Sequence, residues 1–130
     1  MISVWERAYR KSGLYPFAPV IVIDRNPRLI GDGPSSWASY LMVARPRQKR
    51  FVGWGVLPGA YDMSQANEWK RKPVVGGKSL LLMCAIVRDY SHPGDLVCDP
   101  CAGAATTLLA AAIDGRRAVG SEIDHETYMI

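Results

Sequence analysis

The chain has 130 residues, of which 48% are hydrophobic and 22% charged, and its formal net charge at pH 7 is +4. This length suits one domain with its own core, and the mixture of apolar and charged residues excludes an intrinsically disordered chain. No apolar run approaches the roughly 20 residues of a membrane span, and the N-terminal MISVWERAYRK has charges where a signal peptide is apolar. Three cysteines without a secreted disulfide pattern indicate a reducing compartment, so we expect a cytoplasmic protein without a membrane partner.

The first third of the chain predicts one helix and two strands. A short helix is expected over Val4–Ser12, ended by Gly13. The β-branched run PVIVID predicts a strand at 19–24, and the prolines and glycines of residues 25–36 predict a loop. A second strand is expected at Tyr40–Ala44. The two strands together would form an antiparallel pair.

Residues 45–73 form a basic and aromatic region, and its part from Phe51 to Pro73 is predicted to be an extended loop. Basic side chains neutralise phosphates and aromatic rings stack on bases, so this composition favours nucleic-acid binding. A solvated loop with ordinary core aromatics would have the same composition. The candidate phosphate-binding residues are Arg45, Arg47, Lys49, Arg50, Lys70, Arg71 and Lys72, and the aromatic residues among them are Phe51, Trp54, Tyr61 and Trp69.

The last third predicts a βαβ unit preceded by an apolar helix. That helix is expected over Ser79–Tyr90, with a buried stripe of Leu80, Met83, Ile86 and Val87. A strand buried on both faces follows at 95–99, then a helix with its body at 108–113 that Thr106 or Thr107 caps and Gly115 ends. The second strand, at 118–123, carries Glu122 near its carboxyl end. A strand, glycine-containing turn, helix, strand and terminal acid in this order predict a nucleoside-cofactor pocket, although an ordinary βαβ unit without a ligand remains possible.

The residues of this unit carry a family resemblance. The segment Asp99–Thr107, DPCAGAATT, resembles the D-P-F-x-G-S-G-T-T motif of the DNA amino-methyltransferases, which methylate adenine N6 or cytosine N4 with S-adenosylmethionine. Residues 115–124, GRRAVGSEID, are similar to the family's G-R-x-x-x-G-x-E-x-D. Residues 77–80, GKSL, resemble its K-P-x-x-L helix, and a weaker likeness covers residues 31–47.

The resemblance implies an S-adenosylmethionine site, with Asp99 facing the amino-acid portion of the cofactor and Glu122 holding its ribose. It also implies DNA as the partner of the basic region. The sequence departs from the family motif at Cys101, Ala104 and Ala105, and Ala105 replaces a glycine where positive φ would be costly. The residues that the resemblance assigns to the cofactor are Lys78, Asp99, Pro100, Cys101, Gly103, Ala105, Thr106, Thr107 and Glu122.

The catalytic tetrapeptide of the family, [DNS]-P-P-[YFW], does not occur in this sequence. The chain therefore resembles the C-terminal half of a permuted member. We expect an α/β fold over residues 1–130, a single but partial Rossmann-like methyltransferase domain that lacks the catalytic strand. The strand at 96–98 then needs a cover, which could be a second copy, a separate subunit, the strands at 19–24 and 40–44, or the remaining half of a longer protein.

Three alternatives come from the same residues. The chain could be a catalytically inactive methyltransferase-like module that binds DNA or regulates. Cys98 and Cys101 form a C-x-x-C at a strand-to-helix turn, which is compatible with a redox function of thioredoxin type. A zinc site would have to use Cys84, His92 and His125, which do not have standard ligand spacing, so no metal is predicted.

Overall fold

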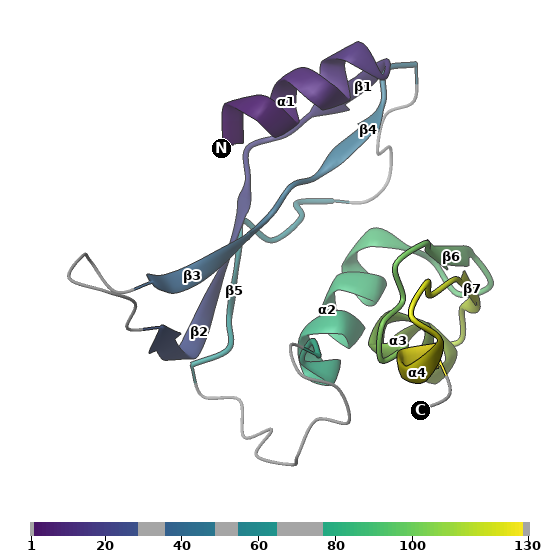
Figure 1. Cartoon of the computed structure of the whole chain (residues 1–130). Coiled ribbons are helices and arrows are strands. Elements are labelled where there is room, and N and C mark those ends of the chain that lie inside the picture. The colour runs from purple at the N-terminus through teal and green to yellow at the C-terminus, as the bar shows by residue number, and fades with distance from the viewer. Residues whose placement is uncertain (1, 29–35, 49–54, 65–76, 129–130) are drawn as a thin grey trace. The chain divides into compact units, whose positions relative to one another are not determined.

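The computed structural model of the chain describes residues 2–28, 36–48, 55–64 and 77–128 (Figure 1). The chain divides into two compact units, Met1–Gln65 and Ala66–Ile130. Helices and short sheets make up both, as expected for an α/β fold. None of the helices in the described part is long and apolar enough to cross a membrane.

The first unit opens with α1 (Ile2–Lys11), which begins and ends slightly earlier than the predicted helix at Val4–Ser12. Gly13 follows as predicted, and its N–H donates to the Arg10 carbonyl at 3.2 Å. Two short strands that were not predicted form a separate pair next to this helix. β1 (Leu14–Pro16) pairs antiparallel with β4 (Ala44–Pro46), and α1 lies beside β1 (Figure 1).

A three-stranded sheet forms the rest of the first unit, in the order β3-β2-β5. β2 (Val20–Arg28) and β3 (Ser36–Leu41) are antiparallel, which confirms the predicted pair. β5 (Ala60–Asp62) pairs with β2 in parallel, within the stretch that was predicted to be an extended loop. Tyr61 of β5 is only 8% exposed and lies opposite Val22 of β2, so it is a core aromatic, the alternative to base stacking that the composition left open.

Two strand boundaries differ from the prediction for identifiable reasons. β2 continues through Asn26-Pro27, inside the predicted loop, and its register with β3 shifts between Ile23 and Arg28. Proline has no backbone N–H to donate to the neighbouring strand. An irregular register leaves some backbone groups unpaired in any case, so a proline is tolerated there. The single strand predicted at Tyr40–Ala44 is divided between β3 and β4, because the chain leaves one sheet and joins the other after Leu41.

The second unit is built on two helices that pack together, α2 (Leu80–Tyr90) and α3 (Thr106–Ile113). Ser79 is the N-cap of α2, and its Oγ accepts a hydrogen bond from the Leu82 N–H at 3.1 Å. The buried residues between the helices are Cys84, Val87, Ala110 and Ala111, with Leu80, Met83 and Val97 packed against them. The two alanines are fully buried, so the small residues of α3 let the helices approach closely.

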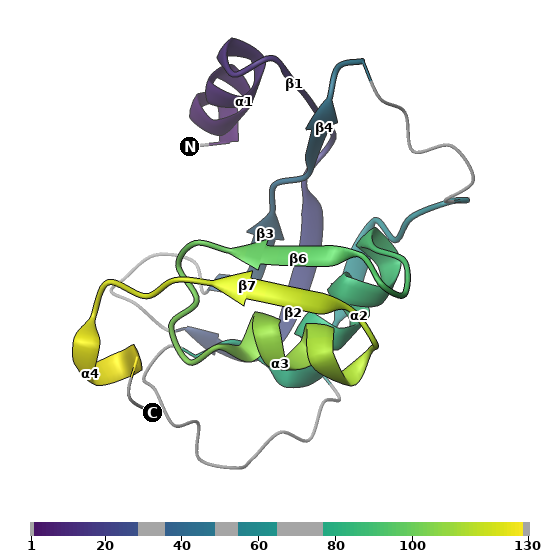
Figure 2. The same cartoon turned by 90° about the vertical axis from the view of Figure 1, so that its right-hand side faces the viewer.

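The strands of the second unit are β6 (Leu96–Asp99) and β7 (Arg117–Gly120), which run parallel, as Figure 2 shows. Among the described residues β6 pairs with β7 alone. The prediction that β6 is buried on both faces is wrong, because Leu96 is 57% exposed and Cys98 is exposed while Val97 packs on the core. This agrees with a partial methyltransferase sheet.

The ends of α3 and β7 also refine the prediction. α3 ends with a Schellman motif, in which the Gly115 N–H donates to the Ala112 carbonyl and the Arg116 N–H to the Ala111 carbonyl, at 3.2 and 2.8 Å. β7 ends at Gly120 instead of Ile123, so Glu122 lies in the loop beyond the strand. A short helix that was not predicted, α4 (His125–Tyr128), follows.

Candidate cofactor site

The turn between β6 and α3 is held by hydrogen bonds to the residue that follows β7. The Asp99 carboxylate accepts from the Cys101 N–H at 3.1 Å, which closes the turn on itself. Ser121 donates its N–H to the Asp99 carbonyl at 3.1 Å and its hydroxyl to the Pro100 carbonyl at 2.9 Å. Its carbonyl also accepts from the Ala102 N–H at 2.8 Å. One residue thus aligns the ends of both strands at a single edge.

Two residues of the turn have left-handed backbone conformations. Gly103 has a φ of +52° and Ala105 a φ of +55°, and Ala105 is the only described non-glycine residue with positive φ. Ala105 is the N-cap of α3 and makes no side-chain cap hydrogen bond. The prediction that Thr106 or Thr107 caps this helix is therefore wrong, since both lie inside its first turn. Ala105 therefore has the positive φ that was expected to cost an alanine conformational free energy at this position.

The Glu122 carboxylate closes the site from the β7 side. Its Oε2 accepts from the Gly103 N–H at 2.6 Å, and its Oε1 accepts from the Asp124 N–H at 2.9 Å. The backbone N–H groups of Asp124, Gly103 and Ile123 lower the pKa of Glu122, because they bind its charged form. The carboxylate is therefore ionised at neutral pH. A carboxylate has about four acceptor positions, so it retains capacity for further donors.

Gly120 explains how the helix can lie so close to the end of β7. A Cβ at this position would lie 2.8 Å from Leu108 Cδ1 and 2.9 Å from the Asp99 carbonyl oxygen. The second of these is a backbone atom of the last residue of β6, directly before the turn, and it cannot move without moving the site. A glycine here therefore allows α3, β6 and β7 to meet at the turn.

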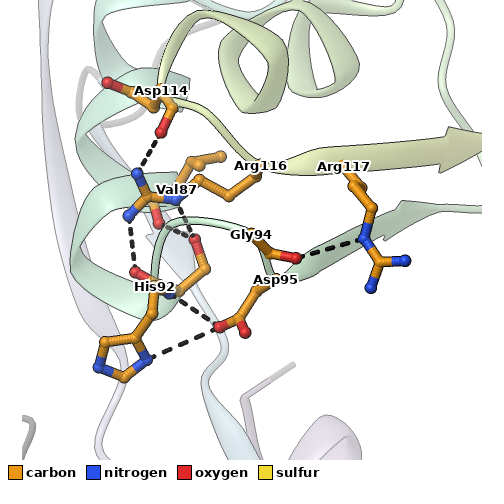
Figure 3. Close-up of polar contacts among 8 residues, drawn as sticks. Val87, His92, Gly94, Asp95, Asp114, Arg116 and Arg117 are labelled. Atoms are coloured by element: carbon orange, nitrogen blue, oxygen red, sulfur yellow. Dashed lines mark hydrogen bonds and ion pairs between the residues drawn. The ribbon is translucent and has the colours of Figure 1, made fainter.

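Arg116 joins α2 to the α3–β7 connection at the opposite end of the βαβ unit, where the strands begin (Figure 3). Its Nη2 donates to the Ser91 carbonyl at 2.7 Å and its Nε to the Ser91 hydroxyl at 2.9 Å. It also donates to the Asp114 carbonyl. Arg116 therefore connects the residues that follow the last turns of α2 and α3.

Asp114 and Arg88 reinforce this connection. Arg88 Nε lies 3.4 Å from Asp114 Oδ1 and donates to the Cys84 carbonyl at 3.2 Å. Arg117, the neighbour of Arg116, makes a more exposed contact, from its Nε to the Gly94 carbonyl at 3.2 Å (Figure 3). The two arginines of the GRR motif therefore differ, since one crosses between helices and the other lies at the surface.

The structure brings most of the predicted cofactor residues together at the turn. Asp99, Pro100, Cys101, Gly103, Ala105, Thr106 and Thr107 are consecutive or nearly so along the turn and the start of α3, and Glu122 bonds to it. Lys78 is exposed just before the cap of α2, and no contact in the described part links it to the turn. Ser121 and Gly120 were missed as site residues, although they lie within the G-x-E pattern that identified Glu122.

The predicted nucleic-acid residues are described only in part. Arg45 is half-buried, and its guanidinium lies 4.9 Å from the centroid of the Tyr15 ring and 5.8 Å from that of Phe17. Arg47 is exposed. The other candidates lie outside the described residues, namely Lys49, Arg50, Lys70, Arg71 and Lys72, as do the aromatic residues Phe51, Trp54 and Trp69.

The residues of the competing hypotheses have simple surroundings. Cys84, Cys98 and Cys101 are reduced thiols outside any disulfide, and Cys84 is buried while the other two are exposed. His92 belongs to the turn before β6, where its N–H donates to Asp95 Oδ2 at 2.8 Å. No group of three or more metal-ligating side chains gathers within the described ranges.

Comparisons with known proteins agree with this geometry. A family model described as DNA methylase matches residues 44–130. The chain is 48% identical over 40 residues to the type II methyltransferase M.MthZI of Methanothermobacter thermautotrophicus, a stretch that is 31% of this chain and 11% of that protein.

Solved methyltransferase structures have a similar fold. The crystal structure of the M1.HpyAVI complex with S-adenosylmethionine matches with a TM-score of 0.76 and 21% identity, over 98% of this chain and 66% of that chain. A putative DNA modification methylase from Thermus thermophilus, complexed with S-adenosyl-L-methionine, matches with a TM-score of 0.66 and 28% identity, over 92% of this chain and 52% of that chain. The chain thus spans part of the length of each relative, and the predicted partial α/β methyltransferase fold is confirmed. It belongs to the DNA methylase family, whose cofactor is S-adenosylmethionine.

Proposed function

We propose that this chain is the S-adenosylmethionine-binding part of a DNA amino-methyltransferase that modifies adenine N6 or cytosine N4. The observation that carries the proposal is the closure of the turn after β6 by Glu122, through its hydrogen bond from the Gly103 N–H at 2.6 Å. This bond places an ionised carboxylate beside a glycine turn at the carboxyl ends of two parallel strands, which is where α/β folds bind nucleoside cofactors. The reducing cytoplasm, where three reduced thiols are stable, is its proposed location.

The residues at the turn fit the chemistry of this cofactor. Glu122 has acceptor capacity left for the two ribose hydroxyls, which are donors. The N-terminus of α3 has no side-chain cap, so its first N–H groups and the helix dipole suit the carboxylate of the methionine portion. Asp99 complements the ammonium group of the same portion. The remaining contacts assigned to the cofactor are those of Lys78, Pro100, Cys101, Gly103, Ala105, Thr106 and Thr107.

When bound, the cofactor supplies a methyl group on a sulfonium, which an exocyclic base nitrogen displaces. The residues of this chain bind and orient it, and catalysis by such an arrangement comes from positioning two reactants. The tetrapeptide that would hold the target amino group is missing from the sequence, so we assign that role to a separate segment or subunit.

The edge of β6 supports a requirement for such a partner. In the described part β6 has a strand neighbour on one side only, and Leu96, Cys98 and Val119 are exposed on the two strands. An additional strand beside β6 would pair its outer backbone groups and cover apolar surface. We propose that the segment carrying the catalytic motif contributes that strand.

The second candidate is a methyltransferase-like module that binds DNA or regulates without turnover. Ala105 favours it, since a residue with φ of +55° at the turn replaces the glycine of the family motif. Cofactor binding separates the two functions, because the enzymatic proposal requires it.

Isothermal titration calorimetry of S-adenosylmethionine into the full chain tests the proposal. We expect the unaltered chain to bind the cofactor. For Glu122→Gln, which removes a charged acceptor, we expect a dissociation constant roughly 10- to 100-fold larger. Glu126→Gln is the matched control, because Glu126 is an exposed acid of α4 outside the turn. No heat of binding at millimolar cofactor would contradict the proposal and leave the non-catalytic module.

A further inference from the structure

The last turn of α1 carries a basic surface that the resemblance does not account for. Arg10 and Lys11 end the helix, and Arg7 lies one turn earlier. Residues three and four positions apart lie on the same face of a helix, so the three cations share one side of α1. All three are exposed.

The tertiary structure brings the start of the predicted basic segment to this end of α1. The Arg47 N–H donates to the Gly13 carbonyl at 3.4 Å, and Leu14 lies opposite Pro46 in the β1–β4 pair. Arg47 therefore lies beside the end of α1, although the two segments are far apart in the sequence. The backbones of Arg10 and Arg47 both contact Gly13, so Arg47 lies near the end of α1 that carries Arg10 and Lys11.

Arg45 adds a cation whose position is fixed. Its guanidinium lies over the Tyr15 ring, and its Nη1 donates to the Pro46 carbonyl at 3.0 Å and the Arg47 carbonyl at 3.2 Å. Tyr15 itself is 45% exposed. An arginine stacked on an aromatic ring presents its charge with little loss of side-chain freedom on binding, because that freedom is already lost.

The charge of this region is strongly unbalanced. Residues 2–17 and 44–48 contain one acid, Glu6, against five basic residues, so they account for the whole net charge of +4. Within the described part, no carboxylate forms an ion pair with Arg10, Lys11 or Arg47. We propose that this surface, formed by Arg7, Arg10, Lys11, Arg45 and Arg47, contacts the phosphate backbone of double-stranded DNA. The choice of DNA as the anionic partner rests on the proposed function.

The salt dependence of duplex binding tests the surface. Each phosphate contact makes the slope of log Kobs against log salt more negative by about 0.9. We expect Arg10→Gln, Lys11→Gln and Arg47→Gln each to make this slope less negative by about 1. The triple variant should make it less negative by about 3. The measurement is fluorescence anisotropy of a labelled duplex of mixed sequence with the full chain, without cofactor, between about 50 and 250 mM NaCl.

Three controls make the result specific. Arg117→Gln removes an exposed cation from β7 and is expected to leave the slope unchanged. Arg10→Lys and Arg47→Lys keep the charge and are expected to keep the slope. Thermal melting of every variant separates this effect from the stabilisation that Arg10 and Lys11 give α1 through its dipole, which alters stability and not the slope.

Three outcomes would overturn the inference. They are an absence of duplex binding by the unaltered chain at about 50 mM NaCl, an equal slope change for Arg117→Gln and Arg47→Gln, and binding to phosphatidylserine vesicles without binding to duplex. The vesicle arm addresses α1 as an amphipathic helix, since Val4 and Trp5 are 62% and 52% exposed. Cofactor calorimetry on the same proteins reports on the proposed function independently, so either can fail alone.

Discussion

The side-chain Oε2 of Glu122 accepts a hydrogen bond from the backbone N–H of Gly103 at 2.6 Å. The bond joins the loop after β7 to the turn after β6, and Glu122 Oε1 also accepts from the Asp124 N–H at 2.9 Å. One carboxylate therefore organises both halves of the candidate cofactor site. The proposed ribose ligand is thus also a structural group, so its substitution should affect stability as well as binding.

The acid dependence of stability should report on Glu122. Its N–H donors lower its pKa from the ordinary value of 4.5, so their stabilisation is complete above that value and is lost as the pH falls through the lower folded pKa. We expect Glu122→Gln to flatten the fall of unfolding free energy below about pH 4.5. Chemical denaturation at a series of pH values measures this. Asp62, whose pKa is lowered by Ser64, contributes equally to both proteins. The prediction would be contradicted if the difference in unfolding free energy between the two proteins stayed the same across the acid range.

Replacing Ala105 with glycine should stabilise the chain. Ala105 has a φ of +55°, where an L side chain is strained and glycine is not. The relief exceeds the extra entropy that glycine gives the unfolded chain, so we expect a gain of about 0.5–1 kcal/mol. Thermal or urea unfolding measures it. Ala104→Gly, at a neighbouring residue without positive φ, should give no gain, and equal gains for the two variants would refute this explanation.

Gly120→Ala should be destabilising by about 1–3 kcal/mol, because the added Cβ meets the Asp99 carbonyl oxygen at 2.9 Å. The displacement of the turn should also weaken cofactor binding. Gly59→Ala is the control, since a Cβ at Gly59 meets nothing within 4 Å. Urea unfolding of both variants tests the steric argument, which fails if Gly120→Ala unfolds at the same urea concentration as the parent.

Arg116→Ala should cost about 1–3 kcal/mol of stability, because it removes the charged donors that satisfy the carbonyl and hydroxyl of Ser91. Arg116→Lys should recover only part of this, since an ammonium cannot reproduce the planar fork. Arg117→Ala, which removes a more exposed contact to the Gly94 carbonyl, should change stability by less than about 0.5 kcal/mol. Similar losses for the two alanine variants would mean that the contact between α2 and the α3–β7 connection contributes little.

Local signals predicted α2, β6, α3 and β7 of the second unit, although not the short helix α4. Ser79 marks the start of α2, Gly115 marks the end of α3, and the apolar stripe marks the buried face of α2. Such signals can be read from the sequence because caps and periodicity act within a few residues. The same reasoning misplaced the cap of α3, because the turn geometry makes Ala105 the N-cap although threonine has the better capping side chain. It also missed β5, since three residues between glycines and prolines carry little periodic signal.

The sequence by itself determined the family, the order of the βαβ elements and the residues that line the turn, since motif spacing and helix signals are local properties of the chain. Only the tertiary structure decided that Ala105 has positive φ, that Ser121 holds the turn and that Arg116 connects two helices. It also decided that Arg47 meets the end of α1 at Gly13. These relationships depend on which backbone groups remain to be paired after distant segments pack, and a linear pattern does not contain that information.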